Sequence, residues 1–228
     1  MLSLPFYITG VFIVTTLLTL AFFISAVKQS AYHKMTTIIL LILLAWLGVQ
    51  MLIALSGFYT TNMTSIPPRF LLAFMPALLT IIALFVTEKG RKFVDSLPLL
   101  TLTYLNVVRI PVELCLYWLF LYKTVPELMT FSGRNFDILA GITAPFIAYF
   151  GMQRQMLGKK GLLLWHVVSL ALLLFIIFNG VLSAPLFFQQ FAFDQPNIAL
   201  LHFPFVWLPA FIVPVVLFGH FTAIRRLH

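Results

Sequence analysis

The sequence predicts an all-α integral membrane protein, a bundle of seven transmembrane helices with its N-terminus outside and its C-terminus inside. Three observations predict this fold. First, 62% of the 228 residues are hydrophobic and 9% are charged, whereas soluble domains carry about 25% charged residues. Second, the chain contains seven apolar runs of the length, about 20 residues, that crosses a bilayer. Third, basic residues gather in alternate connections between these runs.

The seven runs form one polytopic domain, residues 1–228, because no polar stretch between them is long enough to fold separately. In order, they span about residues 4–27, 36–57, 70–88, 98–122, 136–152, 161–182 and 199–221.

The first three runs are distinguished by the charges around them. No Lys or Arg precedes the first run, and Lys28 and Lys34 follow it. A cleaved signal peptide has the opposite arrangement, with its positive charges first. We therefore expect the first run to be retained as a helix. The second run follows Lys34, and the third, which contains Pro76, ends at a basic cluster in residues 89–92.

The fourth run contains the strongest functional lead. Arg109 and Glu113 lie near its middle, where an ionised side chain costs several kcal/mol unless it is paired or faces a protein interior. Their i,i+4 spacing places both groups on one helical face, within reach of each other. Asn106 and Tyr117 extend that face in both directions. Pro111 lies between the two charges and removes a backbone donor, so we expect a kink and a cavity at this level.

The fifth run has a face of small residues, which recur at spacings of four and three along the chain. Small residues let helix backbones approach closely in lipid, so this helix is expected near the centre of the bundle. The acid at its outer end is favoured there by the helix dipole. The face comprises Asp137, Gly141, Ala144, Ala148 and Gly151.

The last two runs complete the charge pattern. A basic cluster precedes the sixth run, and another follows the seventh, which also contains three prolines. Ten of the 14 Lys and Arg residues then lie on one side, and the positive-inside rule places that side in the cytoplasm. These ten residues are Lys28, Lys34, Lys89, Arg91, Lys92, Arg154, Lys159, Lys160, Arg225 and Arg226.

Several function classes are disfavoured. The net charge of +8 comes from short clusters between apolar runs rather than from a basic patch with interleaved aromatics, so no nucleic-acid partner is expected. A retinal Schiff base needs a lysine within the bundle, and no predicted helix contains one. No motif of the G-protein-coupled receptors is found, and topology alone is an analogy.

An intramembrane, metal-dependent hydrolase is the enzyme alternative, drawing on Asp137 and three histidines. Depth argues against one shared site, because His202 and His220 are 18 residues apart, about 27 Å along a helix. His166 and His220 can meet, but two imidazoles leave a catalytic zinc short of its usual three protein ligands. Haem ligation by the same pair is geometrically allowed. We expect neither a metal nor a cofactor.

The preferred interpretation is a plasma-membrane protein (the inner membrane in a bacterium) that binds or transports a small molecule, lipid or ion. Its other partner is the lipid bilayer. Two alternatives stay open: a structural ion pair that binds nothing, and a sensor or assembly factor without a substrate. The predicted ligand-binding residues are Asn106, Arg109, Glu113, Tyr117 and Asp137.

Overall fold

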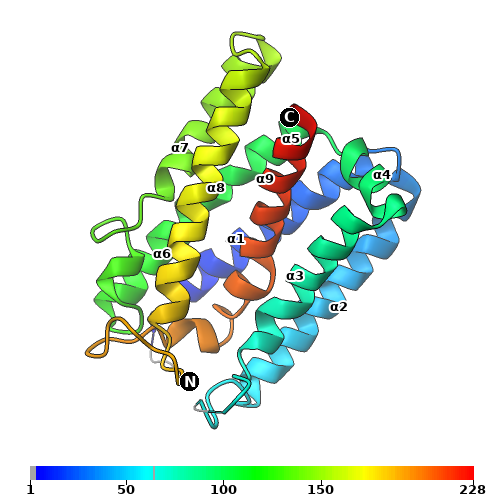
Figure 1. Ribbon diagram of the computed structural model, residues 1–228. Helices are drawn as coiled ribbons and strands as arrows, with labels where there is room; N and C mark the ends of the chain where they lie inside the picture. Colours follow the sequence, from blue (N-terminus) through cyan, green and yellow to red (C-terminus); the bar gives the residue numbers. More distant parts are fainter. Residues whose placement is uncertain (1–3, 64) are drawn as a thin grey trace.

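The computed structural model describes residues 4–63 and 65–228, which are shown in Figure 1. Over these residues the regular structure is helical and contains no strand, which confirms the all-α class. The helices run back and forth, so that the start of α1 and the C-terminus lie at opposite ends of the bundle (Figure 1). We call these the N-terminal end and the C-terminal end.

Nine α-helices account for most of the described residues, and short 3-10 or π-helical segments extend several of them. Leu105–Val108 is a 3-10 segment that joins two of the helices into one rod, and Ile147–Gln153 and Leu208–Ile212 are π-helical. The α-helices are α1 (Phe6–Lys28), α2 (Thr36–Leu55), α3 (Leu71–Val86), α4 (Glu88–Ser96), α5 (Leu99–Tyr104), α6 (Arg109–Leu121), α7 (Ile138–Phe146), α8 (Lys159–Leu182) and α9 (Val213–Leu227).

Five helical stretches are long and apolar enough to cross a membrane, which supports a membrane protein. A sixth appears if α3 and α4, which meet at an angle of 94°, are counted together, and the helix Ile138–Gln153 is shorter than these. The seven-helix count and the orientation therefore stay predictions. The five long stretches are Phe6–Lys28, His33–Leu55, Leu99–Leu121, Lys159–Leu182 and Leu208–Leu227.

The last helical stretch lies at the centre of the bundle, whereas α2 lies at its edge. In the most apolar part of Leu208–Leu227, 72% of the residues are buried, against 17% for His33–Leu55. In Figure 1, α2 and α3 stand on one side, α6, α7 and α8 stand on the other, and α1 and α9 lie between them. The centre is thus formed by the last helix rather than by the fifth predicted run.

The seventh predicted run starts with a short 3-10 segment, Ala199–Leu201, and its continuous helix begins only at Leu208. The chain before it makes irregular turns that bury Phe205 and Val206. Prolines at positions 204 and 209 explain the late start, because a proline has no N–H for the helix ladder. Pro214 likewise cannot donate to the carbonyl of Ala210, and the indole Nε1 of Trp46 donates to it instead at 2.9 Å.

Helix α4 has no counterpart among the seven predicted runs, because its charged residues read as a connection. It begins where the Thr87 side chain accepts a hydrogen bond from the backbone N–H of Gly90. Asp95, near its end, accepts two hydrogen bonds from Arg225 of α9, at 2.9 and 3.0 Å. The C-terminal end of the central helix is therefore tied to α4.

The predicted small-residue face is buried, from Gly141 to Gly151. A Cβ placed on Gly141 would lie 3.0 Å from the side chain of Ile110 and 3.2 Å from the Cβ of Arg109. Glycine at this position lets α7 approach the start of α6 closely. That approach brings Asp137, just before α7, to Arg109.

Candidate functional site

Arg109 is the hub of a buried polar cluster. Only 3% of it is exposed, and its guanidinium reaches three helices. Nη1 lies 3.0 Å from Oδ1 of Asp137 and donates to the carbonyl of Ser169 at 3.3 Å. Nη2 donates to Nε2 of His220 at 2.8 Å. The side chain therefore connects α6 to α7, α8 and α9.

The salt bridge of Arg109 is with Asp137, whereas the sequence interpretation placed it with Glu113. The contact meets the distance for an ion pair but not the angles of a hydrogen bond, so Oδ1 of Asp137 keeps an unused acceptor site. Glu113 lies one helical turn from Arg109 without a direct contact within salt-bridge distance. The close approach of α7 at Gly141 explains the difference, because it brings a second carboxylate nearer to the guanidinium.

Asn135 fixes Glu113 in place. Its amide Nδ2 donates to Oε1 of Glu113 at 2.6 Å and to the carbonyl of Met129 at 3.0 Å. Its Oδ1 accepts the backbone N–H of Asp137 at 2.9 Å. One side chain thus holds Glu113 and the start of α7 in a fixed relation. The other oxygen of Glu113, Oε2, is buried and has no hydrogen-bond partner among the described residues.

Two histidines continue the cluster toward the C-terminal end. The Nδ1 atoms of His166, on α8, and His220, on α9, are 3.1 Å apart. Nε2 of His166 lies 3.4 Å from the hydroxyl oxygen of Thr103. The sequence argument that these rings can meet is confirmed. The sequence suggested that Asp137 lies at a different depth from the histidines, but Arg109 contacts both Asp137 and His220 and joins them in one cluster.

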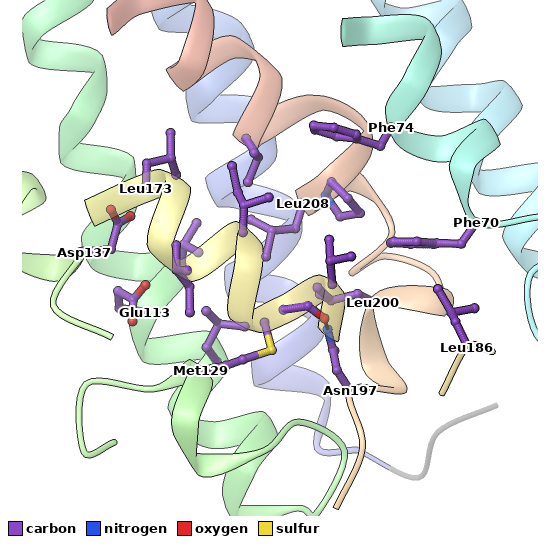
Figure 2. A pocket seen from close by; sticks show the side chains of 18 of the residues that line it. Phe70, Phe74, Glu113, Met129, Asp137, Leu173, Leu186, Asn197, Leu200 and Leu208 are labelled. Atoms are coloured by element: carbon purple, nitrogen blue, oxygen red, sulfur yellow. Dashed lines mark hydrogen bonds between the residues drawn. The ribbon is translucent and has the colours of Figure 1, made fainter. Parts of the chain in front are cut away.

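A cavity of about 120 Å³ adjoins the carboxylates. Figure 2 shows Glu113 and Asp137 together at one end, with Phe70 and Phe74 at the other. Asn197 is a further polar side chain in the wall, and the remaining side chains that line the cavity are apolar. The cavity is wide enough for several waters, since one water needs about 10–15 Å³. A cavity at this level was expected, and its walls are mainly apolar.

Two of the predicted ligand-binding residues lie away from this cavity. Asn106 is buried, but its Nδ2 donates to the carbonyls of Leu102 and Thr103 in its own helix. Tyr117 is half-buried, and its ring stacks on that of Phe131 with centroids 4.8 Å apart. The structure thus brings together Arg109, Glu113 and Asp137 and leaves the two ends of the predicted stripe outside the cavity.

A metal or haem does not fit the histidine pair as it stands. Both nitrogens of His220 are engaged, Nε2 by Arg109 and Nδ1 by His166. Binding a metal through either nitrogen would break one of these contacts. Among the described residues, no group of three or more His, Cys, Asp and Glu side chains is arranged to hold a metal ion.

Sequence reasoning missed Asn135 and the connection from Arg109 to His220. Asn135 lies two residues before Asp137, and an Asn just before a helix is a common helix-start signal, which is the one hint that the sequence offers. The Arg109–His220 contact joins residues 111 positions apart. No spacing rule along a single helix reports on such a contact.

Comparison with known proteins gives a family but no activity. A family described as a domain of unknown function, DUF8737, matches residues 66–228, more than half of the chain. No curated protein and no solved structure matches. The matched region contains the whole buried cluster and the cavity.

Proposed function

We propose that this chain, which belongs to the DUF8737 family, binds a small molecule within the membrane. The small molecule has an ammonium group and an apolar portion. The ammonium lies at Glu113 and Asp137, and the apolar portion fills the cavity beyond them. The observation that carries the proposal is the cavity itself, which has two buried carboxylates at one end: Oε2 of Glu113 has no hydrogen-bond partner, and Oδ1 of Asp137 has the ion pair with Arg109 but no hydrogen bond.

Charge balance favours a cationic group. Two carboxylates, Glu113 and Asp137, face one guanidinium, that of Arg109. An unpaired charge in a low-dielectric site is strongly unfavourable. A ligand cation supplies the missing positive charge, and its N–H groups satisfy the unused oxygens. Hydrogen bonds between charged groups are shorter and roughly twice as strong as those between neutral groups.

The size and walls of the cavity suit a compact apolar group. An apolar protein cavity of about 150 Å³ binds benzene, and the volume here is about 120 Å³. Phe70, Phe74 and Leu208 form the apolar end. A ring or short alkyl chain fits this space, and an ammonium on its near end reaches the carboxylates.

The same proposal includes the membrane frame. The protein crosses the plasma membrane seven times with its N-terminal end outside, so that the cavity lies nearer to the outer surface. The support is the charge pattern of the connections. An intramembrane enzyme is less favoured, because Arg109 stands between Asp137 and His220 and engages both.

Binding of benzylammonium to the purified full-length protein tests the proposal. We expect Glu113→Gln to weaken its affinity at least about tenfold, since a hydrogen bond to a charged group contributes about 1.5–3 kcal/mol and about 1.4 kcal/mol corresponds to a factor of ten. Glu127→Gln is the matched control, because Glu127 is an exposed carboxylate near the same end of the bundle. Benzyl alcohol, which has the same ring without the charge, should bind more weakly.

The readout is calorimetry in detergent at fixed pH and salt. Equal affinity of the wild-type protein and E113Q for benzylammonium would contradict the proposal, and so would stronger binding of benzyl alcohol than of the cation. A loss of affinity in E127Q equal to that in E113Q would point to nonspecific electrostatics.

A further inference from the structure

The buried cluster contains a hydrogen-bond chain whose direction can be assigned atom by atom. Arg109 has N–H donors and no acceptor. Its Nη2 lies 2.8 Å from Nε2 of His220, so that ring nitrogen must accept and carry no hydrogen. A neutral His220 then carries its hydrogen on Nδ1.

The tautomer of His220 also fixes the tautomer of His166. Nδ1–H of His220 donates to Nδ1 of His166 at 3.1 Å, so the hydrogen of His166 is on Nε2. That N–H points to the hydroxyl oxygen of Thr103 at 3.4 Å. The Thr103 hydroxyl donates its own hydrogen to the carbonyl of Leu99 at 2.8 Å. The chain therefore runs in one direction, from Arg109 to Leu99, and both histidines in it are neutral.

Within this hydrogen-bond chain, the lone pair of each imidazole already accepts a hydrogen bond. The lone pair of His220 accepts from Arg109, and that of His166 accepts from His220. A proton taken up by the pair must break one of these two hydrogen bonds. In either case an imidazolium then lies beside the guanidinium, and two like charges at this separation repel strongly inside a protein.

Among the groups around the histidine pair, Arg109 is the one that protonation of the pair would displace. It is the charged side chain in contact with the rings and comes from α6; Asp137, at the start of α7, and Glu113, on α6, lie beyond it. The other ring contacts, Thr103 of α5 and Trp165 of α8, are uncharged. Repulsion therefore directs the guanidinium away from His220 and toward the two carboxylates.

A displaced guanidinium has a favourable destination. Asp137 is already 3.0 Å from Nη1, and Glu113 is one helical turn along α6, within reach of an i,i+4 pair. Oε2 of Glu113 and Oδ1 of Asp137 have acceptor sites to offer. These are the oxygens that the proposed ammonium ligand uses. Arg109 and the ligand thus compete for the same acceptors.

We propose that the His166–His220 pair is a proton-binding site that competes, through the position of Arg109, with cation binding at Glu113 and Asp137. A proton on the pair moves Arg109 onto the carboxylates and expels the ligand, and a bound ligand keeps the pair neutral. The inference rests on the proposed function. Because coupling between two sites is reciprocal, each partner weakens the other by the same factor, typically about 5- to 150-fold.

Nitrogen NMR of the full-length protein, labelled with ¹⁵N-histidine, tests this inference with benzylammonium as the probe. At high pH we expect His220 to carry its hydrogen on Nδ1 and His166 on Nε2. Saturating probe should shift the titration midpoint of both rings to lower pH. His33 and His228, which are exposed, are internal controls, and their signals should not respond to the probe.

The variant H166Q/H220Q separates the pair from the carboxylates, which also take up protons in acid. It should bind benzylammonium but retain that binding to lower pH than the wild-type protein does. If the variant does not fold, the titration of His166 and His220 in the wild-type protein still tests the proton competition.

Three results are informative in different ways. Identical midpoints of His166 and His220 with and without bound probe would overturn the proton competition while leaving the proposed function intact. The opposite tautomers would overturn the chain from which it is derived. Failure of benzylammonium to bind at every pH would overturn the proposed function, and the competition with it, even if the tautomers are as assigned.

Discussion

Arg109 illustrates how the environment, rather than spacing along one helix, selects a partner. The i,i+4 rule places Glu113 within reach, but Asp137 forms the observed ion pair. Each of the three charged residues is at most 4% exposed, so none of them is stabilised by bulk water. The identity of the partner therefore has a large energetic consequence.

Double-mutant cycles measure how strongly Arg109 is coupled to Asp137 and to Glu113. We expect R109M or D137N alone to destabilise the protein by about 3–5 kcal/mol, because each removes one partner of the buried Arg109–Asp137 ion pair. The double variant R109M/D137N should lose much less than the sum. The coupling of Arg109 with Glu113, measured by E113Q in the same background, should be smaller. Thermal unfolding in detergent gives all the values, and a larger coupling for the Arg109–Glu113 pair would contradict the assignment.

At the scale of helices, the close contact between α7 and α6 positions the site. A Cβ on Gly141 would lie 3.1 Å from the backbone nitrogen of Ile110, and a backbone atom cannot rotate away. Gly141→Ala should therefore destabilise the protein by about 1–3 kcal/mol, the usual cost of overpacking. It should also weaken benzylammonium binding, because α7 carries Asp137.

Gly48 provides the matched control for this change. It lies within α2, and a Cβ added to it would have no other atom within 4 Å. Gly48→Ala should be neutral or stabilise the helix by up to about 1 kcal/mol, the difference in helix propensity. Chemical denaturation of the wild-type protein and the two variants gives the comparison. Equal stabilities of G141A and G48A would show that the contact at Gly141 is not tight.

Features that depend on one continuous stretch of sequence were predicted more accurately than features that depend on contacts between distant segments. Helices α1, α2, α8 and the rod Leu99–Leu121 end within a few residues of the predicted bounds, because a continuous apolar run is a local signal. The bend after α3 and the irregular start of the last run were not predicted. A proline shows where a helix ladder is broken, but not what the chain does there.

The site was predictable to the same limited degree. Arg109 and Glu113 were recognisable because a charge in an apolar run is costly, and Asp137 because it begins a helix of small residues. Their partners Asn135 and His220 come from other elements, and only the packing of the rod Leu99–Leu121 against α7 and α9 brings them into contact.

For the whole molecule, cysteine labelling in intact cells tests the prediction that the C-terminal end faces the cytoplasm. In a Cys115→Ala background, which removes the one native cysteine, we expect external reagent to modify Ser132→Cys but neither Lys89→Cys nor Gly158→Cys. All three positions are exposed, so access depends on the side of the membrane. Labelling of Gly158→Cys from outside would reverse the orientation and place the cavity nearer to the cytoplasm.

The attachment of α2 has a mechanical consequence. Trp46 of α2 donates to the carbonyl of Ala210, and Trp207 donates in return to the carbonyl of Leu47, each at 2.9 Å. Apolar contact alone holds a peripheral helix weakly in lipid, because hydrocarbon tails offer the same contact. The two reciprocal hydrogen bonds instead fix the position of α2 along its axis. A shift of α2 along its axis by one residue would break both at once, so these bonds oppose sliding of the helix.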